Sequence, residues 1–219
     1  MRAALCLAAL LTSTAAFAQS SAPPGPYIID LRGGMIGAPG GDFYPAAPAG
    51  TQVPQRGFGF SVGGHIYPFR LGVAQVGVGA DLLRARGSSS SAIGVDAAMR
   101  VTTVAPQISF NFGSRDGWSY LSAGYGVTQT RAEVDIPEME VTPPEAQDDD
   151  VPEPEPEPLP AGTVVREVRT GTINVGGGAR WFIREHLAVG FDVRFHRLGS
   201  TSGLPSKQIV GLSVGASLR

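Results

Sequence analysis

Three histidines and two nearby serines are the side chains best suited to catalysis. His196 lies close in the sequence to Ser200 and Ser202, and a histidine can act as the base that activates a serine nucleophile. The acidic third member would have to come from elsewhere in the chain, and no candidate stands out. His186 sits in a short turn and is most simply a solvated side chain. The sequence therefore predicts no catalytic residue and a non-enzymatic protein, with a His/Ser hydrolase as the alternative.

An acidic, proline-rich segment is the other candidate for chemistry. Residues 133–157 hold 11 of the 19 acidic residues and no Lys or Arg. The run Asp148–Asp150 could hold Ca²⁺ weakly, but it lacks the glycine-punctuated ligand loop that a calcium site needs. Repeated Glu-Pro pairs favour an extended, solvated chain. We expect a hydrated, disordered loop, with a cation-binding or partner-binding brush as the alternative, and we predict no metal site and no cofactor.

Composition limits the remaining function classes. The 219 residues carry a formal charge of −2 and a single lysine, Lys207. Nucleic-acid binding needs a basic stripe, so we predict no nucleic-acid partner. Beyond the N-terminus the chain has no apolar run of about 20 residues, which excludes a bundle of membrane-spanning helices.

The first 18 residues predict a secretory signal peptide. Arg2 precedes an apolar stretch, and Ala16-Phe17-Ala18 forms a small-x-small cleavage site. The mature chain would then comprise residues 19–219. Cys6, the one cysteine of the sequence, falls within the signal peptide. Disulfides, thiolate metal sites and cysteine nucleophiles are therefore not expected in the exported protein.

Apolar and polar residues alternate with a period of two along most of the mature chain, as in Leu187–His196. This pattern predicts strands with one apolar face. Most segments have 11 or more residues, enough for a tilted strand to cross a bilayer. The eight segments are 27–37, 57–69, 73–86, 97–113, 118–134, 164–183, 187–198 and 208–219.

The connections between these segments alternate in length. Tight links at 70–72, 114–117 and 184–186 alternate with longer ones at 38–56, 87–96, 135–163 and 199–207. By composition we expect 38–56 and 87–96 to be flexible connectors. Alternation of this kind places the short turns at one end of a barrel and the long loops at the other. We predict an all-β fold, an eight-stranded antiparallel up-and-down transmembrane β-barrel, with 135–163 as an external acidic loop. A soluble lipocalin-like barrel with its apolar face inside is the alternative.

Two local runs, Tyr120–Gly126 and Gly176–Phe182, together with the signal peptide and the eight-segment meander, resemble the eight-stranded outer-membrane β-barrel proteins of the OmpA-like type. The resemblance implies residence in the outer membrane of a Gram-negative bacterium and a structural or surface-interaction role. Implied partners are the barrel assembly machinery, outer-membrane lipids including lipopolysaccharide, and a surface partner met by the external loops. Some barrels of this kind are hydrolases of lipid A or peptides, which extends the enzymatic alternative.

Strand parity also predicts a charged interior. An eight-stranded barrel is just filled by side chains, so charges on its inner face should pair with one another. We expect an ionic network that closes the lumen, with Arg32, His65, Arg180 and Asp192 at similar heights. The predicted members are Asp30, Arg32, His65, Asp81, Arg180, Asp192 and Arg194.

Overall fold

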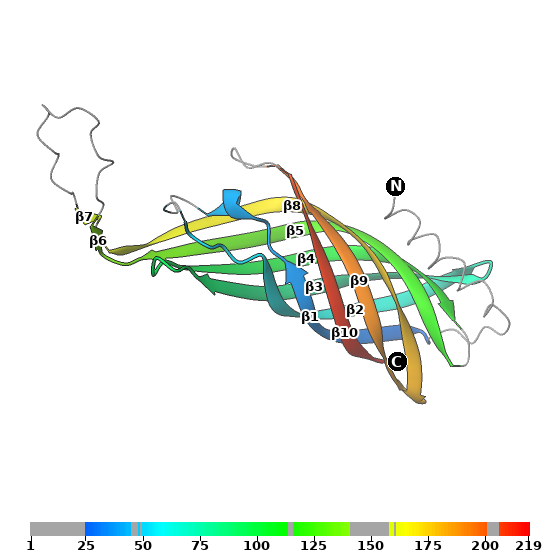
Figure 1. Ribbon diagram of the computed structural model, residues 1–219. Coiled ribbons are helices and arrows are strands. Elements are labelled where there is room, and N and C mark those ends of the chain that lie inside the picture. Colours follow the sequence, from blue (N-terminus) through cyan, green and yellow to red (C-terminus); the bar gives the residue numbers. More distant parts are fainter. Residues whose placement is uncertain are drawn as a thin grey trace, which may run out of the picture.

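The computed structural model describes residues 25–44, 48, 50–113, 116–140, 158–159, 161–200 and 206–219. Eight strands form a closed antiparallel barrel in which each strand pairs with its neighbour in sequence, and β1 pairs with β10 (Figure 1). The barrel strands are β1 (Tyr27–Gly37), β2 (Arg56–Leu71), β3 (Ala74–Ser90), β4 (Asp96–Gly113), β5 (Gly117–Ile136), β8 (Gly162–Arg184), β9 (Leu187–Leu198) and β10 (Lys207–Leu218). The fold class and all eight predicted strands are confirmed.

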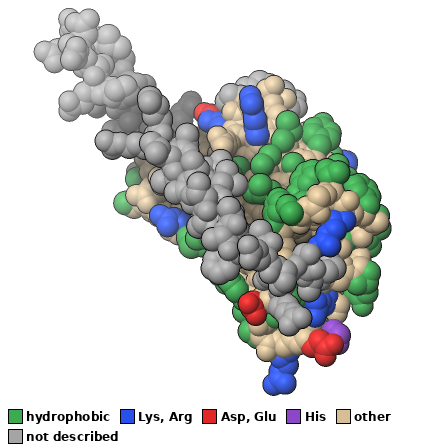
Figure 2. Space-filling view, turned by 90° about the vertical axis from the view of Figure 1, so that its right-hand side faces the viewer, with side chains coloured by type: hydrophobic (Ala, Val, Ile, Leu, Met, Phe, Trp, Pro, Cys, Tyr) green, Lys and Arg blue, Asp and Glu red, His purple; other side chains and the backbone are tan. Residues whose placement is uncertain are grey.

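Alternation of side chains sorts the residues between two environments. One set of polar and charged side chains, with Arg32, Asp81 and Asp192 among them, points inward and is buried. Apolar side chains such as Leu31, Phe58 and Val214 are about half exposed or more on the outside. On the face seen in Figure 2, hydrophobic side chains accordingly gather in patches on the outer surface. This arrangement is the reverse of a lipocalin-like barrel, so that alternative is wrong. Within the described part of the chain, no helix is long and apolar enough to span a membrane.

The strands differ greatly in length. β5 has 20 residues and β8 has 23, whereas β9 and β10 have 12 each. The last pair between β8 and β9 is Thr172 with Leu198, so the ten residues Gly162–Gly171 run on beyond β9. At about 3.3 Å per residue this extension is roughly 30 Å long. Strands β3, β4, β5 and β8 therefore project from the long-loop end as a curved sheet (Figure 1).

Two of the predicted loops are more ordered than composition suggested. Strands β5 and β8 take in both ends of the segment 135–163, and the short strands β6 (Met139–Glu140) and β7 (Pro158–Leu159) pair beyond them. The predicted loop at 87–96 shrinks to residues 91–95, where the backbone amide of Ser91 donates to the Val95 carbonyl at 2.9 Å. Parity continues through these stretches, and a paired neighbour strand satisfies their backbone groups, so they remain strands.

The segment between β1 and β2 was also expected to be flexible, but part of it is packed. The 3-10 helix η2 (Gly41–Phe43) places Phe43 and Tyr44 against the inner face of the projecting sheet. Asp42 holds this helix against two strands. Its carboxylate lies 2.5 Å from Lys207 Nζ of β10, and its backbone carbonyl accepts a hydrogen bond from Arg166 Nη1 of β8 at 3.0 Å. The segment is rich in proline and glycine, but it packs against the sheet because the apolar side chains of Phe43 and Tyr44 are buried there.

Candidate functional site

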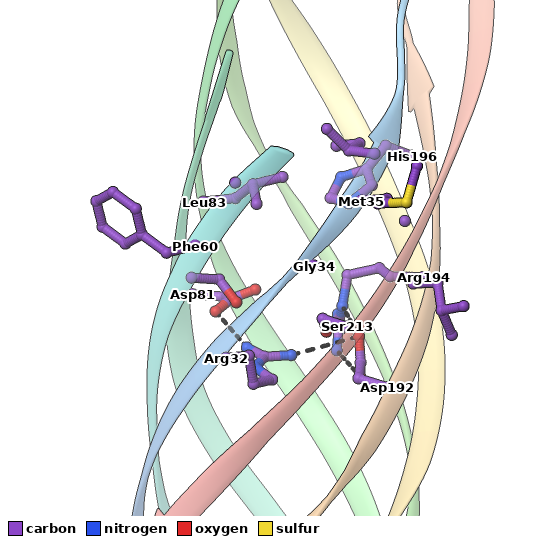
Figure 3. Close-up of a pocket in the computed structure, with 15 residues that line it drawn as sticks. Arg32, Gly34, Met35, Phe60, Asp81, Leu83, Asp192, Arg194, His196 and Ser213 are labelled. Carbon is purple, nitrogen blue, oxygen red and sulfur yellow. Dashed lines mark hydrogen bonds and ion pairs between the residues drawn. The ribbon is translucent and has the colours of Figure 1, made fainter. Parts of the chain in front are cut away.

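The interior of the barrel centres on Arg32 of β1. Its guanidinium lies between two carboxylates from other strands: Asp81 Oδ1 of β3 is 2.5 Å from Nη2, and Asp192 Oδ1 of β9 is 3.4 Å from Nη1 (Figure 3). All three side chains are less than a tenth exposed. Their pairing therefore links opposite sides of the barrel through a region with little access to water.

Asp192 joins this pair to a wider network. Arg194 Nη2 lies 3.2 Å from Asp192 Oδ2, and the Tyr120 hydroxyl donates to the same oxygen at 2.7 Å. Arg194 also donates to Asn174 Oδ1 and to Ser122 Oγ, each at 2.9 Å. Charge-assisted hydrogen bonds of this kind are about twice as strong as neutral ones.

A second ionic layer lies nearer the short turns. Arg180 Nε is 3.4 Å from Asp30 Oδ1 and donates to Ser217 Oγ at 2.9 Å, and Ser217 in turn donates to Asp30. Arg180 also donates to the Tyr120 hydroxyl at 3.0 Å, with its guanidinium carbon 5.2 Å from the centre of the Tyr120 ring. Tyr120 therefore connects the two layers, and three aspartates are balanced by three arginines.

Glycines make room for these side chains. A Cβ atom at Gly63 would lie 3.1 Å from both Arg32 Nη2 and Asp81 Oδ1. A Cβ at Gly215 would lie 2.7 Å from Arg32 Cγ and 2.2 Å from a backbone oxygen. The glycines on the inner face thus leave the space that the long arginine side chains occupy.

Apolar layers border the network on both sides. Toward the short turns, Ile28, Trp118 and Ala188 pack with Tyr67, Tyr120 and Phe182. Toward the long loops, Ile36, Ala85, Leu198 and Ile209 form one cluster. Further out lies a larger cluster: Phe43, Tyr44, Val95, Ala97, Met99, Val101, Ala132 and Val134. The ionic layers are therefore enclosed by apolar side chains along the barrel axis.

The structure brings together six of the seven residues that parity assigned to the lumen. His65 is the exception: its ring stacks on Tyr67 with centroids 6.5 Å apart, and its Nε2 has no hydrogen-bond partner among the described residues. The expectation of similar heights is wrong for Arg180, which pairs one layer below Arg32. Tilted strands in a barrel are staggered, so equal counts from the turns do not give equal heights. Tyr120 was missed, although it shares its inward parity with Trp118 and Ser122.

The residues considered for hydrolysis are not assembled into a catalytic group. His196 is 3% exposed and lies with Arg194 and Gly34 around a cavity of about 30 Å³, large enough for one water molecule (Figure 3). Ser200 is exposed, His186 is an exposed turn residue 3.9 Å from Glu185, and Ser202 lies outside the described residues.

No cluster of three His, Cys, Asp or Glu side chains suited to a metal ion occurs among the described residues. The run Asp148–Asp150 lies outside them, as does the predicted signal peptide 1–18.

Comparison with known proteins agrees with this architecture. The family model described as "Outer membrane protein beta-barrel domain" matches residues 4–217. The chain belongs to this family. Because the family consists of outer-membrane barrels, this chain belongs in the outer membrane of a Gram-negative bacterium. No curated protein matches the chain in sequence.

Several solved structures are similar at low sequence identity. Ail, the attachment invasion locus protein of Yersinia pestis, solved with the heparin analogue sucrose octasulfate, is 10% identical, with 88% of this chain and 95% of that chain covered and a TM-score of 0.48. Neisserial surface protein A is 11% identical, with the same coverage and a TM-score of 0.48. The outer membrane protease OmpT from Escherichia coli is 8% identical, with 92% and 99% covered and a TM-score of 0.49.

Proposed function

We propose that this outer-membrane barrel is a non-enzymatic protein with a closed lumen that acts at the cell surface, in a structural or surface-interaction role. The observation that carries the proposal is the projecting sheet. Strands β3, β4, β5 and β8 continue beyond the shorter strands at the long-loop end, which in such barrels faces the exterior. A sheet of this length offers a partner a stable, paired surface in place of a set of loops.

The interior supports a closed lumen. A conducting barrel needs a continuous polar path, whereas here the ionic layers lie between apolar clusters at both ends. Eight strands leave an interior that side chains fill, and aqueous channels use about 16. The partners follow from the outer surface: lipids of both leaflets, lipopolysaccharide among them, against the apolar band, and the assembly machinery that inserts such barrels after signal-peptide-dependent export.

A barrel hydrolase is the second candidate, favoured only by His196 lying beside a small cavity. A serine hydrolase needs the histidine within hydrogen-bonding distance of the nucleophile. Purified protein that released fatty acids from lipid A, or cleaved a peptide library, and lost the activity on His196→Gln would establish this candidate in place of the proposal.

Orientation can be tested with single cysteines, because the predicted mature chain has none. Ala92 is exposed in the turn between β3 and β4, and Glu185 is exposed in the turn between β8 and β9. We expect a membrane-impermeant maleimide to label Ala92→Cys on intact cells and Glu185→Cys only after lysis. The reverse pattern would place the projecting sheet in the periplasm and refute a surface role. Equal labelling of both in denatured samples is the control for reactivity.

A further inference from the structure

Arginines from adjacent strands face one another on the outside of the projecting sheet. Arg86 of β3 is the direct partner of Arg100 of β4, and Arg100 is the direct partner of Arg131 of β5. All three side chains are exposed. In the next row toward the short turns, exposed Arg84 and Arg169 occupy β3 and β8. These five residues form the arginine belt.

Such a row is costly without a counter-charge, because like charges directly opposite each other destabilise a sheet. The charge of Arg131 is partly neutralised, since its Nε lies 2.6 Å from Glu133 Oε1. Glu167, beside Arg131 in the register, accepts a hydrogen bond from Gln129. Among the described residues, the side chains of Arg86 and Arg100 have no ion-pair or hydrogen-bond partner. Their positive charge is therefore available to an anion from outside the chain.

The belt lies at the edge of the apolar band. One row closer to the short turns than Arg84, the outward residues are all apolar: Val62, Leu82, Val104 and Val127. Within the belt's own two rows, the outward partners on β2 are Phe58, 67% exposed, and Phe60, 49% exposed. A ligand bound here would contact cationic side chains and an apolar surface at the same level along the barrel axis. This combination suits an amphipathic molecule.

We propose that the arginine belt binds the phosphate groups of glycolipid headgroups in the outer leaflet, the lipid A part of lipopolysaccharide, with the acyl chains against Phe58, Phe60 and the apolar band below. The guanidinium fork matches phosphate oxygens in bidentate geometry. Basic residues beside an apolar band attract anionic headgroups, and the effect weakens with salt. The inference rests on the proposed surface role for its orientation, since phosphorylated glycolipid is on the side that the long loops face.

The test compares two double variants folded in the same zwitterionic detergent. Arg86→Gln/Arg100→Gln removes two adjacent charges of the belt, and Arg70→Gln/Arg184→Gln removes two exposed arginines at the short-turn end. Each protein is titrated with diphosphoryl lipid A in mixed micelles, and bound lipid is counted by native mass spectrometry. We expect the belt variant to bind about 25-fold more weakly than wild type, or ~2 kcal/mol for two arginines. The control should stay within about 2-fold. Circular dichroism and heat-dependent gel mobility confirm folding.

Three further probes separate the sources of the anion. Dephosphorylated lipid A should bind wild-type protein weakly, with about the affinity of diphosphoryl lipid A for the belt variant. Free pyrophosphate should bind wild-type protein more weakly still. Equal binding of lipid A with and without phosphate, or an unchanged belt variant, would overturn the proposal. Heparin binding that depends on the belt while lipid binding does not would also overturn it, in favour of an acidic polysaccharide. These outcomes are independent of cysteine labelling, so a wrong orientation and a wrong ligand give different results.

Discussion

Replacing Arg32 by alanine should destabilise the barrel by about 4 kcal/mol. Among the described residues, Arg32 is the only ion-pair partner of Asp81, whose side chain is 7% exposed. Asp192 would keep Arg194 and the Tyr120 hydroxyl. The cost therefore falls mainly on Asp81, and removing one member of a buried pair typically costs about 3–5 kcal/mol. Adding Asp81→Asn to Arg32→Ala removes the stranded charge, so the double variant should recover about 1–3 kcal/mol.

The measurement is equilibrium urea unfolding of protein refolded in phospholipid vesicles, followed by tryptophan fluorescence and by heat-dependent gel mobility. Arg56→Ala is the matched control, because Arg56 is exposed at the start of β2 and should change stability by less than about 0.5 kcal/mol. If Arg32→Ala lost less than about 1 kcal/mol, or if Asp81→Asn gave no recovery, the charges would be well hydrated. The lumen would then be a wet path, and wild-type protein should conduct in planar bilayers.

Other changes probe the remaining parts of the interior. Tyr120→Phe should cost about 2–3 kcal/mol in the same assay, because it removes a hydroxyl bonded to two charged groups; a loss under 0.5 kcal/mol would show that the two layers are independent. Phe43→Ala should lower the free energy of unfolding by about 3 kcal/mol or expose the segment 38–44 to proteases, because it leaves a cavity in the outer apolar cluster. Tyr44→Phe should leave stability almost unchanged at neutral pH, since the Tyr44 hydroxyl has no partner among the described residues. Burial raises the pKa of Tyr44 to about 12, so wild type should lose stability relative to Tyr44→Phe as pH rises from 10 to 12. Replacing 141–157 by a short glycine-containing turn should leave the β-type circular dichroism in detergent unchanged, and loss of that signal would make the segment structural.

Alternation with a period of two was enough to find the strands and to assign side chains to the two faces. It identified the inward position of Asp30, Asp81 and Arg194 because parity is a local property. It could not give their heights, because the stagger of a barrel depends on pairings across the whole sheet. Composition did not predict the packing of the segment that holds Phe43. Prolines and glycines indicate a chain without regular strands, but such a chain can still bury its aromatic residues.

Hydrogen bonding and side-chain alternation leave one ambiguity that the charged interior resolves. A slip of one residue between strands turns every side chain to the wrong face, but a slip of two preserves the alternation. Since acyl chains make no specific contacts with the apolar band, that part of the outer surface would accept the shift at little cost. On the inside, a slip of two residues in β9 would move Asp192 by about 7 Å along the strand, out of reach of both Arg32 and Tyr120. The ionic layers therefore distinguish one register from its nearest competitor, and the apolar clusters at either end make the distinction large by keeping water from the stranded charges.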